Sequence, residues 1–205
     1  METRKTGTTT VGIKYKSGIV MAAESKATMG NLVASKEAQK IYAIDDKIAV
    51  TTAGSAGDSQ QLVRIVQAEI NLYKIGRGSE ITVNAVSTLL SNILQASRYY
   101  PWLAMMILGG VDKKGAHLCS LDPIGGGGDD EYISTGSGSP MAYGVLEDGY
   151  KKNMTKEEAI KLAVRSIRAA RERDIYSGGL QINVVAIEDS GMEFVNPDKI
   201  AELVK

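Results

Sequence analysis

Apolar and polar residues alternate along the first part of the chain, with the period of two that is typical of strands. Residues 8–14 alternate and are β-branched, residues 18–24 form a compact apolar run, and Lys16-Ser17-Gly18 lies between them. These stretches predict a β-hairpin. The next expected features are a turn over residues 28–31 and a second strand pair over residues 40–44 and 47–53.

Helical spacing of the apolar residues replaces alternation in the next part of the chain. The glycine-bearing segment 52–58 ends the second strand pair and opens a helix, which Gly76 and Gly78 stop. Residues 83–94 predict a second helix that ends before Pro101. The apolar positions of these helices are Leu62, Val63, Ile65, Val66, Ile70 and Tyr73, then Val83, Val86, Leu89, Leu90, Ile93 and Leu94.

Strands and then helices follow again in the second half of the chain. Thr155 and Glu158 have the T-x-x-E spacing of a capping box, which predicts the start of a long helix. Residues 125–131 contain consecutive glycines followed by acidic residues, and predict a flexible, solvated loop. The other expected elements are strands over 102–111 and 116–121, a helix over 141–150, strands over 180–187 and 192–195, and a final helix over 197–205.

The order of these elements predicts an α+β fold. Strand blocks with one apolar side, separated by pairs of helices, indicate two stacked sheets with helices outside them, a four-layer α/β/β/α sandwich. The 205 residues show no linker and no internal repeat, so we expect a single domain.

Composition excludes several classes of function. The 24 basic and 24 acidic residues cancel and are interspersed, so nothing points to nucleic acid or to a membrane surface. No apolar run approaches the roughly 18 residues that a bilayer-spanning helix needs, and the first residues lack the apolar core of a secretory signal. The single cysteine fits a reducing, cytoplasmic setting.

The scarcity of histidine and cysteine limits the chemistry further. His117 and Cys119 lie on the same face of an expected strand, so a Cys-His pair is geometrically feasible, although a packed strand is the favoured interpretation. One histidine and one cysteine fall short of the ligand set that zinc prefers, and residues 125–131 lack the ligand spacing of a calcium loop. We expect no metal or other cofactor, and chemistry based on Thr, Ser, Lys, Asp or Glu.

Gly7 followed by three threonines is the most unusual stretch of the chain. A cut between Gly7 and Thr8 would give Thr8 both a hydroxyl and a free α-amine, which together supply a nucleophile and a general base. The α-amine titrates at about 7.7–8.0, so part of it is unprotonated at neutral pH. Without further information, a polar N-terminus leading into a strand explains the same residues.

Five stretches taken together resemble a known family. Over nearly its whole length the chain is similar to a β-type subunit of the 20S proteasome, closest to the archaeal kind, within the N-terminal-nucleophile hydrolases. The resemblance implies the same four-layer sandwich that the element order predicts. The stretches that carry it are residues 6–12, 53–58, 134–140, 143–147 and 173–179.

The resemblance implies a role for each matching residue. Thr8 would be the nucleophile, Lys40 the cation that lowers the pKa values of its amine and hydroxyl, and Glu24 the partner of Lys40. Gly54 would donate its N–H to the oxyanion. The residues that would hold the amine of Thr8 and an ordered water are Ser137, Asp174 and Ser177. Residues 1–7 would be a propeptide removed autocatalytically between Gly7 and Thr8, leaving 8–205 as the mature domain.

The resemblance also implies a pocket for the substrate residue that precedes the cut. None of its positions is charged, so we expect cleavage after apolar or aromatic residues. The pocket positions are Ala27, Thr28, Ala38, Tyr42, Thr52 and Ala56.

The implied partners are other β subunits in seven-membered rings, flanking α rings, unfolded protein substrates and an ATP-driven unfoldase acting through the α ring. The chain lacks a phosphate-binding loop of the G-x-x-x-x-G-K-[ST] type, so ATP use would belong to a partner. One alternative is a structural ring subunit that does not cut, although Gly7, Thr8 and Lys40 are all present. A smaller two-ring bacterial relative, or an amidase acting on small molecules, is a third interpretation; residues 134–140 and 173–179 favour the archaeal type.

Overall fold

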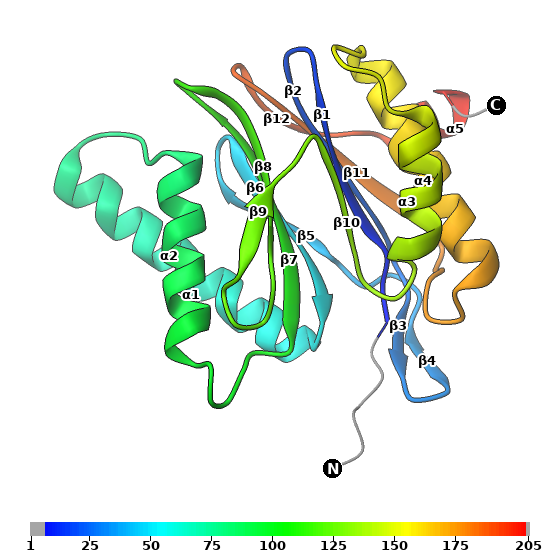
Figure 1. Cartoon of the computed structure of the whole chain (residues 1–205), viewed down its shortest axis with the longest axis horizontal. Coiled ribbons are helices and arrows are strands. Elements are labelled where there is room, and N and C mark those ends of the chain that lie inside the picture. The colour runs from blue at the N-terminus through cyan, green and yellow to red at the C-terminus, as the bar shows by residue number, and fades with distance from the viewer. Residues whose placement is uncertain (1–6, 204–205) are drawn as a thin grey trace.

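The computed structural model describes residues 7–203 and has four layers (Figure 1). One sheet has the strand order β10-β1-β2-β11-β12 and the other β5-β6-β7-β8-β9. Helices α1 and α2 cover the outer face of the second sheet, and α3 and α4 cover the outer face of the first (Figure 1). The predicted α+β, four-layer α/β/β/α sandwich is confirmed.

The bounds of the elements follow the chain in order. The first half contains β1 (Thr10–Tyr15), β2 (Gly18–Glu24), β3 (Ala27–Met29), β4 (Leu32–Ser35), β5 (Ile41–Asp45), β6 (Ile48–Gly54), α1 (Ala56–Arg77) and α2 (Val83–Ala96). The second half contains β7 (Ala104–Asp112), β8 (Gly115–Leu121), β9 (Gly127–Asp129), β10 (Tyr132–Thr135), α3 (Ser139–Gly149), α4 (Lys156–Arg173), β11 (Ile182–Glu188), β12 (Gly191–Phe194) and α5 (Pro197–Leu203).

Strand β2 shows how alternation builds the layers. All of its residues are buried, because it lies in the middle of its sheet and both faces of that sheet are covered. Ile19, Met21 and Ala23 face the core between the two sheets, whereas Val20 and Ala22 face the core beneath α3 and α4. Period-two alternation therefore divides one strand between two hydrophobic cores.

Local signals set the ends of the helices. Ser55 caps α1 by accepting the N–H of Asp58 at 3.4 Å, and Gly78 ends it in the left-handed conformation. The predicted capping box is present at α4: Thr155 Oγ1 accepts the N–H of Glu158 at 3.2 Å, and Glu158 accepts the N–H of Thr155 at 2.7 Å.

Three segments differ from what the residue pattern predicts, and one of them is residues 132–135, which form the unpredicted strand β10 beside β1. Residues 28–31 are more than a turn, because β3 and β4 pair on either side of Gly30 and form a separate hairpin. The prediction of a flexible loop over residues 125–131 is also wrong in part, since β9 lies within it and extends the second sheet beside β8. Gly127 permits this pairing, because a Cβ there would lie 1.9 Å from the carbonyl oxygen of Ser120. Glycine carries no side-chain periodicity, so alternation cannot reveal such a strand.

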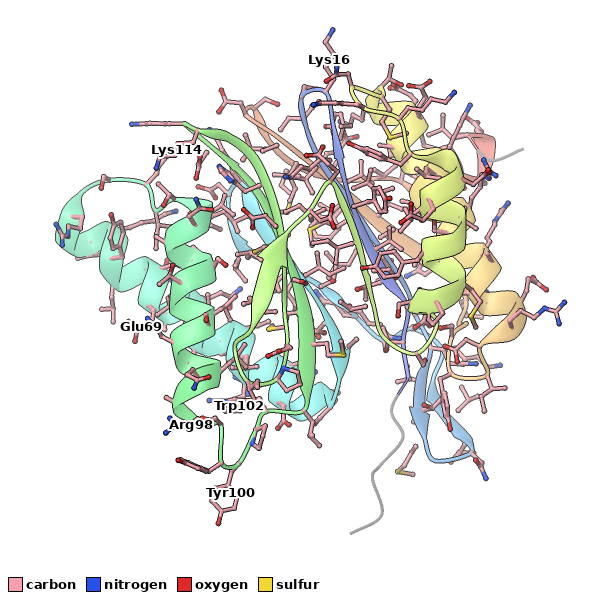
Figure 2. All side chains as sticks on the ribbon, viewed as in Figure 1. Lys16, Glu69, Arg98, Tyr100, Trp102 and Lys114 are labelled. Atoms are coloured by element: carbon pink, nitrogen blue, oxygen red, sulfur yellow. The ribbon has the colours of Figure 1, made fainter. Side chains whose placement is uncertain are left out.

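Some side chains at the turns and loops project from the surface of the molecule. Lys16 projects from the turn between β1 and β2, and Tyr100 projects from the loop between α2 and β7 (Figure 2).

Two strands begin later than the residue pattern predicts. Strand β7 begins at Ala104 and β11 at Ile182, each two residues after the predicted start. Residues 204–205 of the expected last helix and residues 1–6 lie outside the described part. Among residues 7–203, no helix combines the length and the apolar character needed to cross a bilayer.

Antiparallel pairing gathers the ends of several elements at one place. The start of β1 lies beside the end of β2, and the start of β5 lies beside the end of β6. The segment that follows α4 leads to the start of β11, which pairs with the end of β2. The residues that flank these ends are Thr8, Glu24, Lys40, Gly54, Asp174 and Ser177.

Candidate active site

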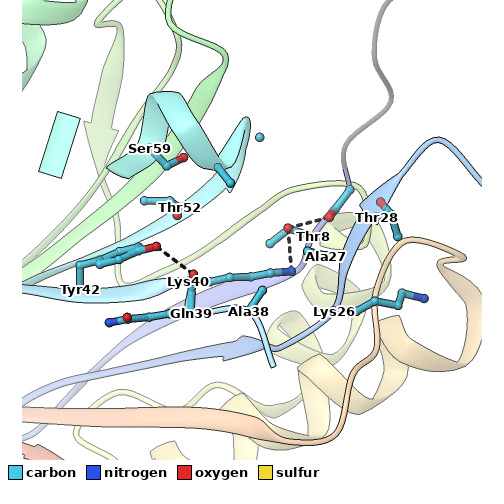
Figure 3. Close-up of a pocket in the computed structure, with 13 residues that line it drawn as sticks. Thr8, Lys26, Ala27, Thr28, Ala38, Gln39, Lys40, Tyr42, Thr52 and Ser59 are labelled. Atoms are coloured by element: carbon cyan, nitrogen blue, oxygen red, sulfur yellow. Dashed lines mark hydrogen bonds between the residues drawn. The ribbon is translucent and has the colours of Figure 1, made fainter. Parts of the chain in front are cut away.

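Thr8 lies in the buried segment that leads into β1, and its hydroxyl has two partners (Figure 3). Oγ1 donates to the carbonyl oxygen of Gly7 at 2.6 Å and accepts from Nζ of Lys40 at 2.9 Å. Thr8 is still bonded to Gly7 in this chain, so its nitrogen is an amide. The hydroxyl is therefore held between a cation and the carbonyl of the preceding residue.

Lys40 is buried and forms an ion pair with Glu24. Burial lowers the pKa of Lys40 below its ordinary value, and the charge of Glu24 opposes this shift. Glu24 is fully buried and accepts the N–H groups of Thr9 at 3.3 Å, Lys26 at 2.7 Å and Gly178 at 3.0 Å. A buried carboxylate with these partners can hold Lys40 in a fixed position.

A second network surrounds the backbone nitrogen of Thr8. Its N–H donates to Oγ of Ser137 at 3.2 Å, and Ser137 donates to Oδ2 of Asp174 at 2.6 Å. Ser177 donates to the same Oδ2 at 2.6 Å and lies 2.6 Å from the hydroxyl of Thr9. Once a free amine replaced the amide, the same nitrogen would face a chain of hydroxyls that ends on a carboxylate. Such a chain can accept, hold or return a proton.

Gly54 ends β6 and lines the same cavity as Thr8. Its φ of +132° lies in the region that side chains disfavour, and a Cβ there would lie 2.1 Å from the carbonyl oxygen of Leu103. Glycine is therefore required sterically, and the bare backbone is what this position presents to the cavity.

The cavity beside Thr8 has a volume of about 100 Å³. The structure places all the predicted pocket residues in its wall: Ala27, Thr28, Ala38, Tyr42, Thr52 and Ala56. It adds Lys26, Gln39 and Ser59, which the residue pattern did not single out (Figure 3). Lys26 is two residues after Glu24 and Ser59 is one helical turn after Ser55, so strand and helix periodicity offered a signal for both.

His117 and Cys119 have other partners and do not form a nucleophilic pair. Nε2 of His117 lies 3.3 Å from Oδ1 of Asp112, and Sγ of Cys119 lies 3.3 Å from Oγ of Ser87. Burial raises the pKa of the Cys119 thiol, which disfavours a reactive thiolate. Within the described part of the chain, no group of three or more His, Cys, Asp or Glu residues is arranged to hold a metal ion.

Comparison with known proteins shows which family the chain belongs to. The family described as "Proteasome subunit" matches residues 4–187. The chain is 54% identical over 198 residues to "Proteasome subunit beta" of Methanocorpusculum labreanum, covering 96% of this chain and 93% of that protein. It is 50% identical over 200 residues to the protein of the same name from Ferroglobus placidus, covering 97% and 95%.

A third relative has a numbered name. "Proteasome subunit beta 2" of Thermococcus onnurineus is 51% identical over 197 residues, covering 95% of this chain and 98% of that protein. The family match spans both the threonine segment and the residues that surround it in space. The chain belongs to the proteasome subunit family and is of the archaeal β type.

Proposed function

We propose that this chain is an N-terminal threonine endopeptidase with Thr8 as its nucleophile. The observation that carries the proposal is the position of Lys40, whose Nζ lies 2.9 Å from Oγ1 of Thr8 while Ser137 accepts the backbone N–H of the same residue. A nucleophile beside a cation, with its own nitrogen on a proton-accepting network, is the arrangement that a threonine peptidase requires.

Maturation would precede peptide cleavage. Oγ1 of Thr8 attacks the carbonyl carbon of Gly7, and the hydroxyl proton passes to the Thr8 nitrogen as the C–N bond breaks. The acyl group is then held on Oγ1 as an ester. Water then hydrolyses the ester, which releases residues 1–7 with a new carboxylate and leaves Thr8 with a free amine. The contact of 2.6 Å between Oγ1 and the Gly7 carbonyl oxygen supports this first step.

The mature site would cut substrates in the same two stages: Oγ1 of Thr8 forms an ester with the substrate, and water then hydrolyses this ester. The amine takes the proton from Oγ1 as the hydroxyl attacks the substrate carbonyl, and returns it to the leaving amine. The positive charge of Lys40 favours the ionised hydroxyl and the neutral amine. The N–H of Gly54 would stabilise the oxyanion, a contribution of about 2.7–4 kcal/mol for a fixed donor.

The cavity wall supports cleavage after apolar or aromatic residues. The six pocket positions carry no charge, and alanines at three of them leave room for a large side chain. Lys26 also lines the cavity, but its side chain extends away from Tyr42 in Figure 3 and its Nζ donates to the carbonyl of Ile175.

The family supports an assembled form. We propose β rings of seven flanked by α rings, with an ATP-driven unfoldase delivering unfolded proteins through the α ring, in the cytoplasm. A structural subunit that assembles without cutting is the alternative. The presence of Gly7, Thr8 and Lys40 in contact favours the active form.

The test is the intact mass of the subunit, assembled with its α partner, before and after incubation. We expect loss of residues 1–7, with cleavage of a peptide that has an apolar residue before the cut. Thr8→Ala should assemble, keep its full mass and lose cleavage by about a thousandfold or more. An unchanged mass in a fully assembled wild-type particle would establish the structural subunit instead.

A further inference from the structure

Lys26 lies where two separate parts of the site meet. Its backbone N–H donates to Oε2 of Glu24 at 2.7 Å, and the N–H of Gly178 donates to the same oxygen at 3.0 Å. The N–H of Ser25 in turn donates to the carbonyl of Gly178 at 3.1 Å. The end of β2 and the segment after α4 are therefore joined through one buried carboxylate.

The side chain of Lys26 adds a second connection. Its Nζ donates to the carbonyl of Ile175 at 2.7 Å. Gly178 leaves room for this side chain, because a Cβ there would lie 3.3 Å from Cδ, Cε and Nζ of Lys26. Residues 174–179 contain no helix or strand. Contacts of this kind therefore add to the backbone hydrogen bonds that Asp174 donates to Ala170 at 2.8 Å and Ser177 donates to Asp174 at 3.1 Å.

We propose that Lys26 is a positioning residue of the threonine site, fastening the segment that carries Asp174 and Ser177 to the strand end that carries Glu24. Lys26 acts on the nucleophile through these residues and does not touch the reacting atoms. This inference rests on the proposed function, because the reaction that it assists is threonine-dependent cleavage.

The charge of Lys26 gives the role a measurable signature. Burial is the main cause that lowers the pKa of Lys40; Lys26 lowers it further, while Glu24 and Asp174 raise it. Loss of the Lys26 charge would let the neighbouring basic groups keep their protons to a higher pH. The charged and titratable groups on the elements that Lys26 contacts are Glu24 on β2, Arg171 near the end of α4, and Asp174 and Tyr176 in the segment after it; Lys40 lies before β5.

The experiment compares Lys26→Met with Lys26→Arg in the assembled, processed particle. Lys26→Met removes the charge and the hydrogen bond at similar side-chain length, so we expect kcat to fall roughly tenfold with KM within about twofold. The acidic limb of the kcat profile should move to higher pH. Lys26→Arg should restore most of kcat and the wild-type limb. Lys16→Met, at the other end of β1, should leave both unchanged (Figure 2).

Several outcomes overturn the inference. A wild-type kcat with an unmoved acidic limb in Lys26→Met would remove Lys26 from the site, and a change confined to KM would make it a substrate-binding residue. If Lys26→Met does not assemble, Lys26→Gln replaces it, since the amide provides a hydrogen-bond donor but carries no charge. An acidic limb of the kcat profile that does not move in Lys26→Gln would also contradict the inference. Failure of the wild type itself to process and cut would overturn the proposed function, which separates the two results.

Discussion

Nζ of Lys40 lies 2.9 Å from Oγ1 of Thr8 and is also paired with the fully buried Glu24. The two lysine contacts differ in their consequences. The contact with Glu24 fixes the position of Lys40, whereas the contact with Thr8 places a positive charge beside the hydroxyl that must lose its proton. A variant of Lys40 removes both contacts, so its cleavage rate and its stability are measured separately.

Lys40→Met should lower peptide cleavage by at least about a hundredfold, because the Thr8 hydroxyl loses the charge that favours its ionised form. The measurement is kcat in the assembled particle. Lys47→Met is the matched control, since Lys47 pairs with Asp189 at the surface. A rate near that of the wild type would remove Lys40 from the mechanism.

Lys40→Met should also lose less unfolding free energy than is usual when one partner of a buried ion pair is removed. Removing one partner of a buried pair costs about 3–5 kcal/mol because the other charge is left uncompensated. Glu24 keeps the N–H groups of Thr9, Lys26 and Gly178. We therefore expect the free energy of unfolding to fall by less than that range, measured by denaturant unfolding. A larger fall would mean that these N–H groups do little to compensate the charge of Glu24.

Gly54→Ala should destabilise the fold by about 1–3 kcal/mol, because the new Cβ requires a disfavoured backbone conformation and approaches the carbonyl of Leu103. Cleavage should fall further than the loss of folded protein explains. The measurements are thermal unfolding and kcat. Gly57→Ala is the control: it lies in helix α1, and its Cβ would meet nothing closer than Oγ of Ser55 at 4.0 Å. An equal effect of both substitutions would contradict the steric argument.

Ala56→Glu should change the residue that is preferred before the cut. Ala56 is exposed, lines the cavity, and opens α1, where a negative charge suits the helix dipole. We expect cleavage after lysine or arginine to rise about tenfold relative to cleavage after leucine, measured as kcat/KM for paired peptides. Asn71→Asp, at an exposed position near the other end of α1, should not change the ratio. An unaltered ratio in Ala56→Glu would place the substrate side chain elsewhere.

Asp112 should stabilise the second sheet and α2 in a pH-dependent manner. Burial alone would raise the pKa of its carboxyl, but the N–H groups of Lys114 and Val83 and the nearby His117 outweigh burial and lower it. Since the folded-state pKa is depressed, the stabilisation is fully present above the unfolded value of about 3.9 and is lost as the pH falls through the folded-state pKa.

Asp112→Asn should therefore cost about 1–2 kcal/mol at pH 7, since the carboxylate accepts the N–H of Val83 at the start of α2. The difference from the wild type should shrink as the pH falls below about 3.9. Denaturant unfolding at several pH values measures it, with the exposed Asp148→Asn as the control. A difference that does not depend on pH would exclude the charge as its cause.

Much of the fold could be predicted from local pattern. Alternation identified β1, a compact apolar run identified β2, helical spacing identified α1 and α2, and Thr155 with Glu158 located the start of α4. These signals are local because they reflect backbone periodicity and the unpaired N–H groups of a helix end. The hairpin of β3 and β4 and the strands β9 and β10 were missed, since strands of three or four residues are too short to show a period.

The candidate site was harder to predict from the residues alone. Thr8, Lys40 and Asp174 are ordinary polar residues at distant positions, and only the resemblance to a family grouped them before the structure did. Oγ of Ser137 lies 2.6 Å from Oδ2 of Asp174, although Ser137 lies just before the start of α3 and Asp174 just after the end of α4. Lys26 was missed because a lysine after a strand looks like a surface residue.

The sequence by itself determined which stretches are strands and helices, and which residue could become a nucleophile once the chain is cut after Gly7. Tertiary structure decided that Lys40, Glu24, Ser137 and Asp174 surround that residue. The reason is physical: side-chain period depends on neighbours within a few positions, whereas antiparallel pairing of β1 with β2 and of β5 with β6 brings distant chain ends to one edge of the molecule.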